Sequence, residues 1–106
     1  MDYKINIKPL SINQAFKGTK VRTHKYNSFI KYCLLELPEK VAFIDKENIK
    51  LAIEFGFSSK LSDIDNCLKT FIDCLVKKYG VDDRYIIELH VFKAIVKKGE
   101  EYIKFK

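Results

Sequence analysis

The chain has 106 residues and a formal net charge of +6 at pH 7. This length allows one domain with a single hydrophobic core, and we expect residues 1–106 to form it. The positive charge favours an anionic partner such as nucleic acid, although many small proteins from lysine-rich proteomes are equally basic and bind no polyanion. The N-terminus lacks the basic-then-apolar pattern of a signal peptide, and no apolar run could span a bilayer. These features argue against a membrane protein and predict a cytoplasmic one.

The cysteines indicate the redox compartment. Cys33, Cys67 and Cys74 are odd in number and follow no zinc-binding spacing. Cys67 and Cys74 lie on one expected helix, too far apart to be bridged within it. We therefore expect three buried thiols in a reducing compartment.

The N-terminal part begins with an alternating segment. Residues 3–8 place apolar side chains on one face and polar ones on the other, which predicts a half-buried strand that Pro9 ends. From Pro9 to about Lys25 no period holds, and polar and basic residues gather around Phe16. Such a loop suits contacts with DNA phosphates, and it also suits a solvated connection; the sequence leaves both interpretations open.

The rest of the chain alternates between the helical and the extended pattern. The expected elements are a helix over 26–36, a connection over 40–45 that could include an edge strand, a strand over 49–57, a helix over 66–79, a strand over 84–96, a turn over 97–100 that closes a hairpin, and a strand over 101–106. The order strand, helix, strand, helix, strand, strand predicts an α+β fold with two helices packed on one mixed sheet.

An acidic cluster follows the expected strand over 49–57. In an extended segment, side chains two residues apart point the same way, about 6.5–7 Å apart, so Asp63 and Asp65 could face one metal ion. Asp65 or Asn66 would then cap the next helix, with Lys69 one turn inside it. Carboxylate oxygens with open positions for water and phosphate are typical of a Mg²⁺ site for phosphate chemistry.

The far end of the same helix adds two more carboxylates, Asp82 and Asp83. In this interpretation Lys69 would stabilise negative charge on a phosphate. Each residue also has a simpler explanation. Lys69 could form an ordinary pair with Asp73 at i,i+4, and Asp82 and Asp83 could be turn residues.

Several motifs occur together in chain order. The pattern Asp-x-Asp-Asn-x-x-Lys occupies residues 63–69, Ile-Asp-Cys-Leu follows at 72–75, and Asp-Asp-Arg-Tyr-Ile follows at 82–86. The front of the chain has Pro-Leu-Ser-Ile-Asn at 9–13 with Phe16 after it. In this combination, over nearly the whole length, the chain resembles the RusA family of phage and prophage Holliday junction resolvases.

The resemblance implies a bacterial or phage-encoded homodimer that binds four-way DNA junctions and cuts two strands symmetrically, using Mg²⁺ or Mn²⁺. By position, Asp63, Asp65 and Asp83 would be the catalytic carboxylates that hold the metal, with Asp82 as a further metal ligand beside them. Lys69 would be the catalytic lysine. The residues expected to contact DNA are Asn13, Lys17, Lys20, Arg22, His24, Lys25 and Lys60.

The chain departs from the family pattern at two places. Ser62 stands where the family usually has a basic residue, and Lys60 could take over its contact with the DNA backbone. The spacing from Asp65 to the later acid pair is slightly short, so Asp82 and Asp83 could exchange roles. Two alternatives therefore stand beside a resolvase. One is a DNA-binding protein of the same fold that has lost cleavage, and the other is a non-catalytic assembly or adaptor protein whose acids cap helices and turns.

Overall fold

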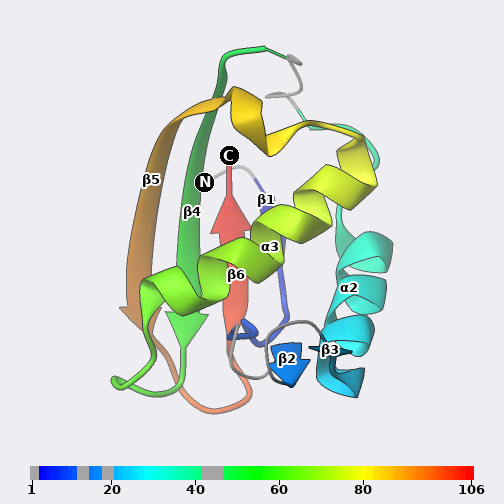
Figure 1. Cartoon of the computed structure of the whole chain (residues 1–106). Helices are drawn as coiled ribbons and strands as arrows, with labels where there is room; N and C mark the ends of the chain where they lie inside the picture. Colours follow the sequence, from blue (N-terminus) through cyan, green and yellow to red (C-terminus); the bar gives the residue numbers. More distant parts are fainter. Residues whose placement is uncertain (1–2, 12–14, 18–20, 42–46) are drawn as a thin grey trace.

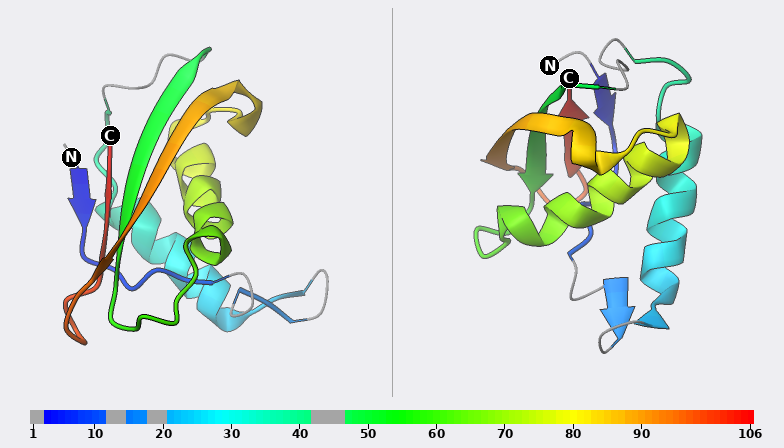
Figure 2. Two further views of the ribbon diagram at one scale, coloured as in Figure 1. Left: turned by 90° about the vertical axis from the view of Figure 1, so that its left-hand side faces the viewer. Right: turned by 45° about the horizontal axis from the view of Figure 1, so that its top comes forward.

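Two helices pack on one face of a mixed four-stranded sheet in the computed structural model, which describes residues 3–11, 15–17, 21–41 and 47–106 (Figure 1). The elements are β1 (Tyr3–Ile5), β2 (Phe16–Lys17), β3 (Val21–Arg22), α2 (His24–Glu36), β4 (Ile49–Phe57), α3 (Ile64–Tyr79), the 3-10 turn η1 (Asp83–Tyr85), β5 (Ile86–Ile95) and β6 (Tyr102–Phe105). The sheet has the order β1-β6-β4-β5, and Figure 2 shows both helices on the same side of it. The expected α+β architecture is confirmed.

Strand β4 lies inside the sheet and carries much of the core. It pairs in parallel with β5 and antiparallel with β6. Its alternate side chains Leu51, Ile53 and Phe55 are each at most 2% exposed. Phe71 of α3 packs edge-on against Phe55 and Phe105, with ring centroids 6.4 and 5.4 Å apart. The loop that leaves β4 therefore starts from a rigid point.

Helix α3 is amphipathic, and its apolar face packs on the sheet. Gly80 ends the helix because it adopts the left-handed conformation, with φ of +65°, and its N–H binds the carbonyl of Val76 at 2.9 Å. The buried hydroxyl of Thr70 lies 2.6 Å from the carbonyl oxygen of Leu10. This contact fixes the segment that follows β1 against α3.

The cysteines lie in the core. Cys33 of α2 and Cys74 of α3 are fully buried, Cys67 is 4% exposed, and all three are free thiols. The expectation of buried thiols is confirmed.

The connection between the last two strands differs from the prediction. The turn over 97–100 forms, with the N–H of Glu100 donating to the carbonyl of Lys97 at 2.9 Å, but β5 and β6 do not pair. They lie on opposite sides of β4. Because α3 connects β4 to a parallel neighbour, β5 takes one side of β4, and β6 takes the other. Alternation along a strand identifies its faces but not its neighbours.

Three element boundaries also shift. Helix α2 begins at His24, two residues earlier than expected, because the side chain of Thr23 caps it. Helix α3 begins at Ile64 instead of residue 66. The first part of the strand expected over 84–96 is the 3-10 turn η1, and β5 starts at Ile86.

The N-terminal region is less regular than the rest. Strand β1 covers only residues 3–5 of the expected 3–8, and the expected loop contains the short β2–β3 ribbon. Asn13, Lys20 and residues 42–45 of the expected connection lie outside the described residues. Within the described ranges, neither helix is long and apolar enough to cross a bilayer.

Candidate active site

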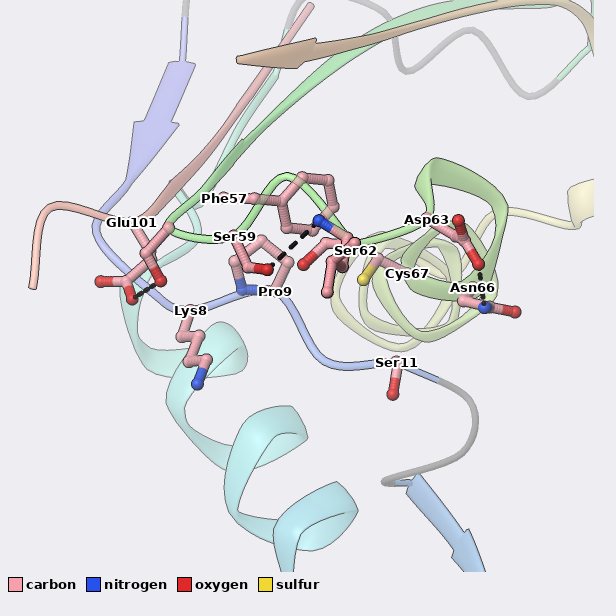
Figure 3. Close-up of a pocket in the computed structure, with 12 residues that line it drawn as sticks. Lys8, Pro9, Ser11, Phe57, Ser59, Ser62, Asp63, Asn66, Cys67 and Glu101 are labelled. Atoms are coloured by element: carbon pink, nitrogen blue, oxygen red, sulfur yellow. Dashed lines mark hydrogen bonds between the residues drawn. The ribbon is translucent and has the colours of Figure 1, made fainter. Parts of the chain in front are cut away.

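A polar pocket of about 390 Å³ lies where β4 ends and α3 begins (Figure 3). The segment after β1 forms one wall, and the loop over 58–62 with the first turns of α3 forms the other. In Figure 3, Asp63 and Asn66 lie at one end of the pocket, and Lys8 and Glu101 lie at the other. The pocket therefore joins an acidic helix end to a lysine on a separate segment.

Asp63 occupies the N-cap position of α3 but does not cap it with its side chain. Its backbone is extended, with φ of −95° and ψ of 134°, and its carboxylate accepts a hydrogen bond from Nδ2 of Asn66 at 3.2 Å. Burial, followed by the charges of Asp63 and Asp65, raises the pKa of the nearby Cys67 thiol to about 11. An exposed carboxylate thus remains at the helix start, within electrostatic reach of Asp65.

The expected same-face arrangement of Asp63 and Asp65 is wrong. It required an extended segment, whereas α3 begins between the two residues at Ile64. Successive helical residues turn by about 100°, so Asp65 falls on the stripe that Lys69 and Asp73 continue at i+4 and i+8. Asp63 lines the pocket instead. The prediction that Asp65 or Asn66 caps the helix is wrong for the same reason.

Lys69 lies between two carboxylates from different elements. Its Nζ is 3.0 Å from Oδ1 of Asp73 on α3 and 3.8 Å from Oδ2 of Asp83 on η1. The hydrogen bond with Asp73, followed by the charges of Asp73 and Asp83, raises the pKa of Lys69 against the opposing effect of burial. Lys69 is therefore a fixed cation, and its side chain is still 55% exposed.

Asp82 and Asp83 have different surroundings although they are adjacent. Asp82 accepts hydrogen bonds from the backbone N–H of Arg84 at 3.0 Å and from its Nε at 2.9 Å. These bonds to Arg84 lower the pKa of Asp82. Asp83 instead faces Lys69. The turn interpretation thus describes Asp82, and Asp83 is the carboxylate that approaches the lysine.

Two residues beside Lys69 were not among the predicted site residues. Asp73 pairs with Lys69 and also accepts a hydrogen bond from the hydroxyl of Tyr26 on α2, at 3.3 Å. The guanidinium of Arg22 and the ammonium of Lys77 lie over the Tyr26 ring, 5.2 and 5.8 Å from its centroid. The i,i+4 spacing between Lys69 and Asp73 could have identified Asp73 from the sequence. Tyr26 could not be identified in this way, because it is 47 residues away from Asp73 in sequence.

The residues expected to contact DNA spread over three places. Arg22 lies at the Tyr26 ring, and His24 and Lys25 are exposed at the start of α2. Lys60 is exposed in the loop after β4. Lys17 lies in β2, and its side chain is outside what the structure describes, as are Asn13 and Lys20.

A cation that the sequence did not indicate lies beside Ser62. Nζ of Lys93, on β5, donates to the carbonyl oxygens of Ser62 at 2.6 Å and of Lys60 at 2.9 Å. It therefore brings positive charge to the position where the family pattern usually has a basic residue. No local pattern in the sequence indicated this contact, because Lys93 and Ser62 are about 30 residues apart in the chain.

Comparison with protein families supplies the decisive observation. Residues 11–105 match the family described as endodeoxyribonuclease RusA. The chain belongs to the RusA endodeoxyribonuclease family. This match covers nearly the whole chain and includes Asp63, Lys69 and η1. No curated protein sequence matches the chain.

The donor set of this RusA-family chain suits a hard divalent cation. Asp63, Asp65 and Asp83 are exposed carboxylates, and oxygen ligands of this kind are those that Mg²⁺ and Mn²⁺ prefer. In the described part of the chain, no three His, Cys, Asp or Glu side chains come together at one point to hold an ion. The chemistry of the ligands therefore fits such a metal, while the arrangement of the side chains does not define its position.

Proposed function

We propose that this chain is a metal-dependent endonuclease that resolves four-way DNA junctions by paired symmetric cuts, in the cytoplasm of a bacterium. The family supports DNA cleavage. The single observation that carries the catalytic assignment is the position of Lys69, held between Asp73 and Asp83 on the stripe of α3 that also carries Asp65. A lysine fixed in this way, still half exposed, is available to an incoming phosphate.

The proposed roles follow from these positions. Asp63, Asp65 and Asp83 would hold Mg²⁺ or Mn²⁺, which when bound would activate water and stabilise the leaving oxygen. Lys69 would bind the scissile phosphate and offset its developing charge, with Asp73 as its positioning partner. Asp82 would fix the conformation of η1 through Arg84, so that Asp83 keeps its direction.

Basic residues on both sides of α3 would bind the DNA backbone. Arg22 lies on the α2 side, beside Tyr26. Lys60 and Lys93 lie on the other side, at the loop after β4. Phosphate contacts of this kind position the duplex without reading its sequence. The charge that Lys93 brings to Ser62 favours an active enzyme over a relative that has lost cleavage.

A second copy of the chain would complete the enzyme. A four-way junction has two-fold symmetry, so a two-fold dimer presents matching sites to opposite strands. Strand β5 is an edge strand of the sheet, and Ile87, Phe92 and Ile95 on it are 47–59% exposed. Exposed apolar side chains on an edge strand suit pairing with an identical strand. Sedimentation of the purified protein as a monomer at assay concentration would contradict this part of the proposal.

The proposal is tested with Asp65→Asn and an end-labelled mobile four-way junction, beside a linear duplex of the same sequence, in Mg²⁺, Mn²⁺ or EDTA. Wild type is expected to make paired symmetric nicks in the junction only, and only with metal. Asp65→Asn should abolish cutting and keep or improve junction binding, because it removes ligand charge and leaves the basic surface unchanged.

Glu36→Gln is the matched control, because it makes the same chemical change at an exposed position on α2. It should cut at the wild-type rate. Cutting by Asp65→Asn at the wild-type rate would refute the assignment of the site. Junction binding by wild type without cutting in any metal would support the alternative of a binding protein. Absence of selective binding would favour an adaptor whose acids serve only as caps and turns.

A further inference from the structure

A second pocket, of about 440 Å³, lies between the segment that follows β1 and the first half of α2. We call it the Phe29 pocket; Ile7, Pro9, Leu10, Phe29 and Tyr32 supply its apolar lining. Phe29 is 6% exposed and belongs to the core, whereas Tyr32 is 42% exposed. The floor of the pocket is therefore fixed, and one aromatic ring on its side remains accessible.

Polar and cationic groups surround this apolar lining. Lys8 comes from the segment after β1, and His24, Lys25 and Ser28 come from the first turns of α2. The N-terminus of a helix carries a partial positive charge that adds to that of the lysines. Among the salt bridges of the described residues, none involves Lys8 or Lys25. Hydrogen bonds to its carboxylate, and then the charge of Lys8, lower the pKa of Glu101 in the neighbouring pocket. Within the ranges that the structure describes, no acidic side chain lines the Phe29 pocket, which thus combines an aromatic, apolar interior with a positively charged opening.

The two pockets are neighbours. Lys8 and Pro9 line both of them, and Figure 3 shows Lys8 at the end of the first pocket that is opposite Asp63. Figure 1 shows the N-terminal ends of α2 and α3 toward the same end of the molecule. A strand of DNA in the candidate active site would therefore pass the opening of the Phe29 pocket.

We propose that the Phe29 pocket binds one unstacked nucleobase of the bound DNA, with the adjoining phosphates at Lys8 and Lys25. Proteins hold unpaired bases by stacking them on aromatic side chains while a basic groove follows the backbone, and this pocket offers both. Its volume lies in the range of pockets that bind small organic ligands. The inference rests on the proposed function, because it requires DNA at the neighbouring site, and it adds a contact with a base to contacts with the backbone.

The occupant follows from charge complementarity. An apolar peptide or a lipid chain would use the lining but not the lysines, and free phosphate would use the lysines but not the lining. A nucleotide uses both, because its base is flat and apolar on its faces and its phosphate is anionic. The branch point of a four-way junction is also where bases lose a stacking neighbour, which lowers the cost of moving one into a pocket.

The test uses four-way junctions in which each nucleotide at the branch point is replaced in turn by the fluorescent base 2-aminopurine, bound in EDTA so that no strand is cut. Wild type is expected to change the fluorescence strongly at one position of each symmetric pair. Ser28→Trp fills the pocket from an exposed position, so the fold should be unaffected. It should abolish that change and weaken junction binding by at least about fivefold, as the loss of one base stack does.

Two substitutions at Tyr32 separate stacking from structure. The Tyr32 hydroxyl donates to the carbonyl of Asn6 at 3.3 Å, and Tyr32→Phe removes only this bond. Tyr32→Phe should keep the fluorescence change, and Tyr32→Ala should lose it. Leu35→Ala is the control, because Leu35 is on the same helix, is 76% exposed and does not line the pocket.

The outcomes distinguish the two proposals. If wild type binds and cuts the junction but Ser28→Trp gives the same fluorescence and affinity, the base pocket is refuted and the proposed function stands. If wild type binds the junction and shows the base signal but never cuts, the pocket stands and cleavage is refuted. If wild type binds no junction, both are refuted.

Discussion

The two faces of α3 differ in what they do for the protein. The face toward the sheet is buried and consists of Cys67, Thr70, Phe71, Cys74 and Leu75. The opposite stripe carries Asp65 and Lys69, which are exposed, and Asp73, which is partly buried. One helical period produces both patterns, because residues three and four apart share a face. Substitutions on the two faces should therefore separate stability from cleavage.

Phe71→Ala should have the largest effect, and on stability. Its ring contacts Phe55 and Phe105, so truncation leaves a cavity between helix and sheet, and we expect a loss of about 3–5 kcal/mol in the free energy of unfolding. Urea denaturation measures it. Leu35→Ala, at a 76% exposed position, should stay within about 0.5 kcal/mol of wild type. A loss below about 1 kcal/mol for Phe71→Ala would contradict the assignment of this face as core.

Lys69→Met should show the opposite behaviour, with a large loss of cleavage and little change in stability. Cleavage of the junction should fall by about 10²–10³-fold, because a cation at the scissile phosphate is removed. Stability should change by no more than about 1 kcal/mol, since Lys69 is 55% exposed and the partly buried Asp73 keeps its hydrogen bond from Tyr26. Single-turnover cleavage and urea denaturation of the same preparation measure both. Lys31→Met, at an exposed position on α2, should cut normally, and equal loss of cleavage in both variants would contradict the special role of Lys69.

Thr70→Val tests a polar group within the buried face. It keeps the shape of the side chain but leaves the carbonyl of Leu10 without its donor, which should lower the free energy of unfolding by about 1–3 kcal/mol. Thr70→Ser keeps the hydroxyl and should retain most of the stability. Equal stability of the valine variant and wild type would show that the segment after β1 is held by other contacts.

Tyr26→Phe should have the smallest effect on the protein. It removes a contact with Asp73, which lies where the buried face and the polar stripe of α3 meet. Loss of the 3.3 Å hydrogen bond to Asp73 should lower stability by about 0.5–1 kcal/mol near pH 8. Burial first, and then Asp73, raises the pKa of Tyr26, so its contribution is complete below pH 10 and decreases as the pH rises through the folded-state pKa. The deficit of Tyr26→Phe should therefore shrink above pH 10 in urea denaturations at several pH values. A deficit that grows with pH would contradict this assignment.

Local patterns predicted the elements better than the contacts between them. The alternation of β4 and the period of α3 follow from residues next to each other in sequence, and both were predicted. The position of Asp63 was not, because a period of two at Asp63 and Asp65 suits a strand, and the helix that begins at Ile64 overrides it. The pairing of β6 with β4, and of Tyr26 with Asp73, depends on tertiary packing that no local pattern encodes.

The place of β6 in the sheet has a consequence for the folding of the protein. Strand β6 lies between β1 and β4, with Phe105 opposite Tyr3 on one side and Ile53 on the other. Strands β1 and β4 thus have no common neighbour until β6 joins the sheet. The pairing of Tyr3 with Phe105 links residues about 100 positions apart in sequence. Because contacts between residues so far apart require the closure of a long loop, which costs conformational entropy, we expect the pairing of β1 with β6 to be among the slow steps of folding.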